Sequence, residues 1–166
     1  MSFLGSKIKK LENGREVLEM QDSVNFAMVT DDNYLLLASQ FRASNQKESI
    51  NLFGGYIEKT ETWKEALYRE MLEESNISKE DVYDIDVLFE NKYVSMGYTS
   101  EKNTTCIVYL NKSLQDLKLK CNDKDENITI IKTWIDTNSI EKLLNKTEGL
   151  KLYLVLKELF RISEYK

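Results

Sequence analysis

The stretch GGYIEKTETWKEALYREMLEESNI, residues 54–77, decides the fold, because a turn with two glycines passes there into a helix that carries an unusual set of carboxylates. Thr62 followed three residues later by Glu65 is the signature of a capping box at the start of a helix. Apolar side chains then recur every four residues, as on the buried face of a helix, at Trp63, Leu67 and Met71. We therefore expect a helix that begins after Thr62 and ends near Ser75-Asn76.

Glutamates on one side of this helix lie where they should repel one another. At about 100° per residue, Glu70 and Glu74 nearly superimpose, and Glu73 lies on the other side of Glu70. Like charges at these spacings destabilise a helix by about 0.2–0.5 kcal/mol per pair. A solvated acidic face is the commonest explanation, but Glu70 and Glu74 border the buried stripe, and Gly54-Gly55 lacks the Cβ atoms that would keep a backbone carbonyl away from a ligand. This combination favours a cluster of oxygen ligands around one or more Mg²⁺ ions.

Length, composition and charge are those of an ordinary globular protein. The 166 residues suit a single domain over residues 1–166, and 42% hydrophobic with 31% charged residues is usual for such a domain. No apolar run is long enough to span a membrane and no signal segment opens the sequence, so we expect an intracellular, cytoplasmic protein. The net charge of −5 and the scattered lysines argue against long nucleic acids as partners, whereas a small phosphorylated ligand is compatible with bound cations.

The absence of histidine narrows the chemistry that the chain can perform. A metal site without histidine must use oxygen ligands, which favours Mg²⁺, Mn²⁺ or Ca²⁺ over Zn²⁺ or copper. The Ser-His and Cys-His nucleophile schemes are excluded as well. Cys106 and Cys121 lie in segments of different character and predict neither a disulfide framework nor a CxxC site. Proton transfer therefore falls to carboxylates, lysine or tyrosine.

The rest of the sequence predicts strands on both sides of the central helix. Asn13-Gly14 is a tight-turn signal between two short strands, so residues 1–22 should form an N-terminal hairpin. Strands are expected at residues 7–11, 16–20, 24–30, 34–40, 82–89, 104–110 and 128–134, helices at 139–144 and 150–160, and loops at 44–49, 95–103 and 122–127. This order argues for a mixed-sheet α/β or α+β sandwich.

The central helix and the turn before it resemble the Nudix box. The resemblance is carried by Gly55, Glu61, the run Arg69-Glu70-Met71-Leu72-Glu73-Glu74, and Ile77. Every acidic and basic position of that pattern is filled at its spacing. The glycine near the end of the pattern is Asn76 here, and asparagine is the next-best residue for a left-handed helix end. The resemblance implies a Nudix-type α/β/α sandwich with a mixed sheet and an N-terminal antiparallel hairpin.

The Nudix resemblance also implies roles for individual residues. Members hydrolyse a nucleoside diphosphate linked to another moiety, with Mg²⁺ or alternatively Mn²⁺. The implied metal ligands in the box are Glu70, Glu73, Glu74 and the carbonyl of Gly54. The implied structural residues are Gly55, Glu61 and Arg69. Arg69 also belongs to the implied catalytic set, because it orients the metal-binding glutamates by ion pairing and hydrogen bonds.

Segments outside the box resemble the Nudix subfamily that cleaves ADP-ribose and other nucleotide sugars. The run QFR, which ends at Arg42, precedes INLFGG as a Gln-aromatic-Arg precedes the LPAG-like segment of that subfamily, and implies a phosphate contact for Arg42. SMGYTSE, residues 95–101, resembles the SPGxTxE loop of the subfamily, with Met96 in place of a proline that would stiffen the loop. The implied substrate-binding residues are Arg42, Gly55, Met96, Gly97 and Glu101.

The segment DKDENITI, residues 123–130, resembles an acidic Asp-Glu-x-Glu loop that supplies a catalytic base and a further metal ligand. Only the second glutamate is retained, as Glu126, and Lys124 occupies the position of the first. The resemblance therefore implies Glu126 as a catalytic residue and a metal ligand. Glu73, which is also in the implied catalytic set, and Asp125 are the alternative bases.

The function implied by the resemblance is Mg²⁺-dependent hydrolysis of ADP-ribose or another nucleotide sugar to a nucleoside monophosphate and a sugar phosphate. A homodimer is expected, with the N-terminal strands at the interface, and no membrane partner is expected. Within the family, the alternatives are dinucleoside polyphosphates, oxidised nucleoside triphosphates or capped RNA ends. From a different class, the alternative is a non-catalytic nucleotide-binding sensor, in which Lys124 marks lost catalysis.

Overall fold

The computed structural model describes residues 7–124 and 126–163. The elements in chain order are β1 (Lys7–Lys10), β2 (Glu16–Glu19), β3 (Ser23–Val29), β4 (Tyr34–Arg42), β5 (Lys47–Asn51), β6 (Phe53–Tyr56), α1 (Trp63–Ser75), the short 3₁₀ helix η1 (Lys79–Asp81), β7 (Val82–Tyr93), β8 (Lys102–Leu110), the 3₁₀ helix η2 (Leu114–Asp116), β9 (Thr129–Trp134), α2 (Thr137–Leu144) and α3 (Leu150–Ser163). Strands thus precede and follow the central helix, as predicted.

The main sheet is mixed and has seven strands within the described residues. Its path runs β5-β4-β3-β8-β7, with β6 beside β3 and β9 beside β4. The β3–β8 pair is parallel, and the other pairs of this sheet are antiparallel. β6 pairs with the first half of β3 and β4 with its end, so β6 brings its glycines to the centre of the sheet.

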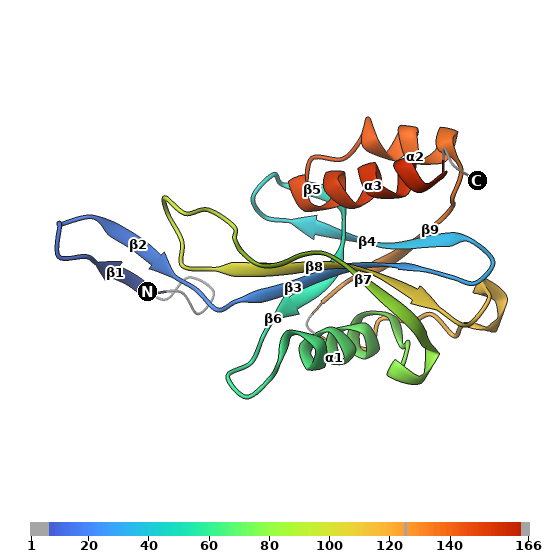
Figure 1. The fold of residues 1–166 in the computed structure, drawn as a ribbon, viewed down its shortest axis with the longest axis horizontal. Coiled ribbons are helices and arrows are strands. Elements are labelled where there is room, and N and C mark those ends of the chain that lie inside the picture. The colour runs from blue at the N-terminus through green and yellow to red at the C-terminus, as the bar shows by residue number, and fades with distance from the viewer. Residues whose placement is uncertain (1–6, 125, 164–166) are drawn as a thin grey trace.

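Figure 1 shows three layers, with α1 on one face of the sheet and α2 and α3 on the other. The side chains of β3 alternate between the two faces, as strand geometry requires. Val24, Phe26 and Met28 contribute to the core beneath α1, and Ala27 and Val29 to the core beneath α3. Each fully buried side chain of the size of Phe26 or Met28 stabilises the fold by about 1.5–3 kcal/mol. The predicted fold class, an α/β sandwich with a mixed sheet, is confirmed.

The N-terminal hairpin is a separate sheet of β1 and β2 that extends beyond one end of the main sheet (Figure 1). Its turn differs from the expected tight one. Leu11 and Arg15 close a wider loop through a hydrogen bond, and in it Gly14 alone has a positive φ, of 80°, whereas Asn13 does not. This is a hairpin loop in which one left-handed glycine follows an ordinary turn, and it matches the twist of the flanking strands.

One predicted loop is wrong in part. Residues 44–49 were expected to lie outside secondary structure, but β5 begins at Lys47 and pairs with β4 in the register Arg42↔Lys47. The segment lacks the alternating apolar residues from which a strand is predicted. It forms a strand because it lies at the edge of the sheet, where backbone hydrogen bonds to β4 stabilise it. Within the described ranges, no helix is long and apolar enough to cross a membrane.

Candidate active site

Helix α1 begins and ends as its local sequence predicts. The Thr62 side chain accepts a hydrogen bond from the Glu65 N–H, and the Glu65 carboxylate accepts one from the Thr62 N–H, which completes the capping box. The helix ends at Asn76, whose φ of 59° and ψ of 30° are left-handed. Both ends are therefore specified locally, and the buried side chains Leu67 and Met71 between them pack the helix on the sheet.

A side chain at Gly54 would clash with the backbone of β3, and a side chain at Gly55 would displace the Glu70 carboxylate from its present place. Gly54 has a φ of +132°, and a Cβ there would lie 2.0 Å from the carbonyl oxygen of Val24. A Cβ on Gly55 would lie 2.1 Å from Oε1 of Glu70. The Gly54 N–H donates to Oε2 of Glu74 at 2.7 Å. The two glycines therefore allow the helix carboxylates to reach the backbone of β6.

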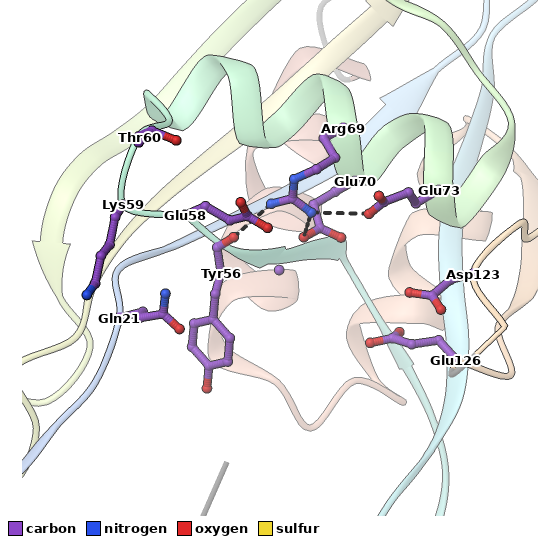
Figure 2. A pocket seen from close by; sticks show the side chains of 11 residues that line it. Gln21, Tyr56, Glu58, Lys59, Thr60, Arg69, Glu70, Glu73, Asp123 and Glu126 are labelled. Carbon is purple, nitrogen blue, oxygen red and sulfur yellow. Dashed lines mark hydrogen bonds and ion pairs between the residues drawn. The ribbon is translucent and has the colours of Figure 1, made fainter. Parts of the chain in front are cut away.

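Arg69 joins the carboxylates of the site to one another. Its Nε and Nη2 donate to the two oxygens of Glu61 at 2.8 and 3.0 Å. Its Nη1 donates to Glu70 at 2.7 Å and to Glu73 at 3.1 Å, and Nη2 also donates to the Tyr56 carbonyl at 2.9 Å (Figure 2). Paired charged hydrogen bonds of this kind fix geometry as well as charge. Arg69 therefore holds the turn after β6 and two helix glutamates in one arrangement.

Burial, together with mutual repulsion, raises the pKa of the two central carboxylates. Glu74 is 4% exposed. Burial raises the pKa of Glu74 to about 8, the Gly54 N–H works against this shift, and the charges of Glu70 and Glu126 add to it. Burial also raises the pKa of Glu70, against the opposing effect of Arg69. Buried carboxylates beside other carboxylates are typical of a functional site.

The acidic loop lies against the end of α1. The backbone N–H groups of Asn122 and Asp123 donate to the Glu73 carbonyl at 2.6 and 3.1 Å. Beyond them, the Glu126 carboxylate accepts a hydrogen bond from Gln40 Nε2 at 2.9 Å and contacts the Glu74 side chain. The loop therefore carries Glu126 to the helix carboxylates, although about 50 residues separate them in the sequence.

These groups border a cavity of about 600 Å³. Figure 2 shows Asp123 and Glu126 on one side of it, facing Glu70 and Glu73. The lining carboxylates are Glu58, Glu70, Glu73, Asp123 and Glu126, and the lining cations are Lys59 and Arg69. The excess of negative charge suits a cation, or an anionic ligand that arrives with cations.

The chemistry of these donors fits a divalent ion, although their arrangement is not that of a closed metal site. Among residues 7–124 and 126–163, no three or more acidic or thiol side chains are gathered closely enough to hold an ion as they stand. Arg69 holds Glu70 and Glu73, and the Gly54 N–H holds Glu74. A divalent ion among these hard oxygen donors would offset both the loss of water and the mutual repulsion that raise the pKa of Glu70 and Glu74.

The predicted site residues fall into two groups. Those brought together in and behind this cavity are Gly54, Gly55, Glu61, Arg69, Glu70, Glu73, Glu74 and Glu126. Arg42 instead lines a second cavity, and Met96, Gly97 and Glu101 are not among the described residues that line the first. Glu101 accepts a hydrogen bond from Ser23 Oγ at 2.6 Å. Asp125 lies outside the described residues.

Several residues of the site are not apparent from the sequence alone. Gln40 holds Glu126, Tyr56 presents its carbonyl to Arg69, and Gln21, Lys59 and Asp123 line the cavity. Gln40 had a usable signal, because it lies two residues before Arg42 on the same face of β4. The other contacts depend on how separate segments pack.

Comparison with known proteins places this geometry in a family. The family model described as NUDIX domain matches residues 20–155 of the chain. The matched range contains β6, α1 and the loop with Glu126, and it leaves the β1–β2 hairpin outside. No curated protein matches the chain.

Proposed function

The chain belongs to the NUDIX family, and we propose on this premise that it cleaves ADP-ribose or a related nucleotide sugar with Mg²⁺. As a family member it is a pyrophosphohydrolase, which acts on phosphorus-containing anhydrides of nucleoside diphosphate derivatives. The observation that carries the proposal is the pair of carboxylates, the half-buried Glu70 and the buried Glu74, that lie against the glycine backbone of β6. The resemblance of QFR and SMGYTSE to the ADP-ribose subfamily supports the choice of substrate.

We assign the ion to the carboxylates of α1 and of the acidic loop. Its ligands would be Glu70, Glu73, Glu74, Glu126 and the carbonyl of Gly54. When bound, Mg²⁺ supplies positive charge against the diphosphate oxygens and against the charge that develops on them during cleavage. The donors are all oxygen, which supports Mg²⁺ and admits Mn²⁺.

We assign different roles to Arg69 and Glu126, which lie near the proposed ion. Arg69 is a positioning residue, because its hydrogen bonds set the direction of Glu70 and Glu73. Glu126 is the group that we assign to take a proton from the attacking water, since it is exposed to the cavity and oriented by Gln40. The water oxygen bonds to a phosphorus and the bond from that phosphorus to the bridging oxygen breaks. ADP-ribose then gives AMP and ribose 5-phosphate.

We propose a homodimer formed through the β1–β2 hairpin. The hairpin reaches beyond the main sheet and leaves Ile8 72% exposed (Figure 1). Its inner strand bonds the loop of residues 95–101, with Leu18 N–H donating to the Tyr98 carbonyl at 2.8 Å. In such a dimer this loop, with Met96, Gly97 and Glu101, borders the interface.

Arg42 remains our candidate for a phosphate contact.

The test is a hydrolysis screen with product identification. The purified protein is incubated with Mg²⁺ and a panel of nucleoside diphosphate derivatives, dinucleoside polyphosphates and nucleoside triphosphates. We expect AMP from ADP-ribose only in the presence of metal ion. Glu74→Gln should lower turnover by at least about 10- to 100-fold, while Glu141→Gln, an exposed change on α2, should leave it unaltered.

Two results would contradict the proposal in different ways. Release of nucleoside monophosphate from another substrate, but not from ADP-ribose, would overturn the choice of substrate and keep the chemistry. Tight binding of ADP-ribose in calorimetry with no turnover of any substrate would favour the sensor alternative, in which Lys124 replaces a catalytic glutamate.

A further inference from the structure

A second cavity, of about 940 Å³, lies between the start of α3 and the sheet. It lies beside α3, whereas the carboxylate site lies beside α1, on the other face of the sheet (Figure 1). Gly55 of β6 lines the first cavity, and Asn25 of β3, which pairs with the adjacent Gly54, lines the second. The two cavities approach each other near Ser23, at the start of β3, where the Glu101 carboxylate accepts a hydrogen bond from Ser23 Oγ. Besides burial, the charge of Glu101 affects the pKa of both Tyr56, which lines the first cavity, and Lys151, which lines the second. An extended ligand that passes this end of the sheet would contact both cavities.

Positive charge dominates the second cavity, although the chain carries a net charge of −5. Its lining cations are Arg42, Lys47, Lys92, Lys146 and Lys151, and its lining carboxylates are Glu48 and Glu148. Lys47 and Glu148 form an ion pair with each other, with Nζ of Lys47 2.6 Å from Glu148. The other lining residues still carry more positive than negative charge, whereas the lining of the first cavity is mainly negative. The second cavity therefore suits an anionic group.

Lys151 differs from the other cations of this cavity, because it is withdrawn from water while they are exposed. Its Nζ donates to Asn25 Oδ1 at 2.7 Å. Over the described ranges, no carboxylate oxygen lies within 4.0 Å of this ammonium, the limit at which the other ion pairs of the chain are found. Burial lowers the pKa of Lys151, and the charge of Glu101 opposes this shift. The structure thus keeps a partly buried cation without a direct ion pair.

Buried polar side chains hold Lys151 in place. Asn103, which is 2% exposed, donates to Asn25 Oδ1 at 2.9 Å and to Ser23 Oγ at 2.8 Å. Thr105 donates to Asn103 Oδ1 at 2.7 Å. These bonds determine which end of the Asn25 amide faces Lys151. The ammonium therefore lies in a preorganised position at the wall of the cavity.

The simpler explanation of Lys151 is that its hydrogen bond to Asn25 holds α3 to β3. This role does not require a charge, however, because a neutral donor could make the same hydrogen bond to Asn25. Withdrawing an ammonium from water without an opposite charge costs free energy. An anionic ligand group would offset this cost, and lysine is well suited to phosphate as a compact point charge.

The rest of the wall indicates that the anion belongs to an organic molecule. Leu52, Phe89 and Leu152 line the cavity beside the cations. Apolar walls with a few fixed polar groups are the usual character of a site for an organic ligand, whereas a free inorganic ion would gain nothing from them.

We propose that the second cavity is a subsite for a phosphate monoester on the substrate, remote from the diphosphate that is cleaved, and that Lys151 is the residue that selects for it. This inference rests on the proposed function in one respect, since it takes the remainder of the same ligand to lie in the carboxylate site. It narrows the substrate class to nucleoside diphosphate derivatives that carry an additional phosphate.

A matched pair of ligands tests this proposal. ADP-ribose and ADP-ribose 2′-phosphate differ by one phosphate monoester. With Mg²⁺, we expect kcat/KM of the wild-type protein to favour the 2′-phosphate by roughly tenfold, the value of one charged hydrogen bond. Lys151→Met should abolish the preference by raising KM for the 2′-phosphate alone. Lys157→Met, the same change at an exposed position of α3, should preserve it.

Calorimetry of the same ligands with EDTA-treated protein provides a readout that does not depend on turnover. The wild-type protein should bind the 2′-phosphate more tightly, and Lys151→Met should remove the difference.

If Lys151→Met does not fold, Arg42→Gln, at an exposed position of the same cavity, should reduce the preference instead. Equal binding of both ligands by the wild-type protein, or an equal loss for both in Lys151→Met, would overturn the proposal. Absence of turnover with the preference in binding retained would overturn only the proposed enzymatic function.

Discussion

The Glu74 carboxylate accepts a hydrogen bond from the Gly54 N–H although it is almost fully buried. One backbone donor does not compensate for the loss of water and for the nearby charges of Glu70 and Glu126, and the pKa of Glu74 rises to about 8. Arg69 meanwhile holds Glu70 and Glu73 by charged hydrogen bonds. At the residue scale, the site therefore contains one carboxylate whose pKa favours protonation at neutral pH and two carboxylates that are held by the Arg69 guanidinium.

The raised pKa of Glu74 predicts a pH dependence of stability without metal. The folded-state pKa of about 8 lies above the ordinary value of 4.5. The contribution of Glu74 to the free energy of unfolding is therefore fully present below pH 4.5, and it is lost as the pH rises through about 8. The melting temperature in EDTA should therefore fall across this window, and the stabilisation by Mg²⁺ should grow.

The variant Glu74→Gln tests the assignment of this pH dependence, because its amide does not titrate. We expect its melting temperature in EDTA to fall less across the same window, whereas Glu141→Gln on the exposed surface should behave as the wild type. Parallel curves for Glu74→Gln and the wild-type protein would show that another group is responsible.

Arg69→Lys tests whether geometry or charge is required at the centre of the ion pairs. Lysine keeps the positive charge but cannot bond both Glu61 oxygens together with Glu70 and Glu73. We expect a loss of about 2 kcal/mol in the free energy of unfolding, measured with urea. Arg161→Lys, in an exposed pair with Glu158, should cost less than about 1 kcal/mol. A similar small loss in both variants would contradict the central role of Arg69.

At the scale of elements, α1 is specified at both ends, and its C-terminal end does more than stop the helix. Asn76 is left-handed, and its side-chain Nδ2 donates to the Lys118 carbonyl at 2.9 Å while its Oδ1 accepts from Asn122 at 3.0 Å. Asn122 also bonds the Glu73 carbonyl. The residue that replaces the glycine of the Nudix box therefore joins the helix to the acidic loop, which a glycine could not do.

Two substitutions at Asn76 separate its backbone role from its side-chain role. Asn76→Gly retains the left-handed turn and loses the two side-chain hydrogen bonds, so we expect a loss of about 1–2 kcal/mol in unfolding free energy. Asn76→Ala loses the same bonds and adds the cost of a left-handed alanine, about 1 kcal/mol more. Urea unfolding of both variants measures the difference. An Asn76→Gly protein as stable as the wild type would show that the loop contacts do not contribute.

At the scale of the whole molecule, the hairpin projects beyond the main sheet (Figure 1), and all but one of the residues of its two strands are exposed. Apolar side chains lie on it and on the loop bonded to β2, with Ile8 72%, Tyr98 77% and Met96 84% exposed. Clustered exposure of this kind is typical of an interface. A second copy of the chain would cover these side chains, and it would also bring the loop of residues 95–101 to a shared boundary.

The dimer proposal predicts the mass of the protein in solution. Sedimentation should give twice the mass of 19.4 kDa for the wild-type chain. Ile8→Lys should give a monomer, because it places a charge in the buried centre of the interface. Tyr83→Lys, which alters a side chain that is 79% exposed on β7, should leave a dimer. A monomeric wild-type protein would contradict the proposal.

The sequence by itself determined the features that depend on neighbours in the chain. The capping box at Thr62, the left-handed Asn76 and the i, i+3 and i, i+4 spacing of the helix glutamates are local, and each lies where it was predicted. The order of strands and helices was predicted for the same reason, since a period of two or of about 3.6 is a property of a short segment. Two strands were not predicted, the polar β5 and the glycine-containing β6, because each is stabilised by pairing with a neighbouring strand.

Tertiary structure decided which segments meet. The approach of Glu70 to Gly55, the hydrogen bond from Gln40 to Glu126 and the burial of Lys151 on Asn25 join residues far apart in the chain. Such contacts follow from the packing of whole layers and leave no periodic pattern in any one segment. The reaction class could therefore be predicted from α1 alone, whereas the second, cationic cavity became visible only when α3 was packed on the sheet.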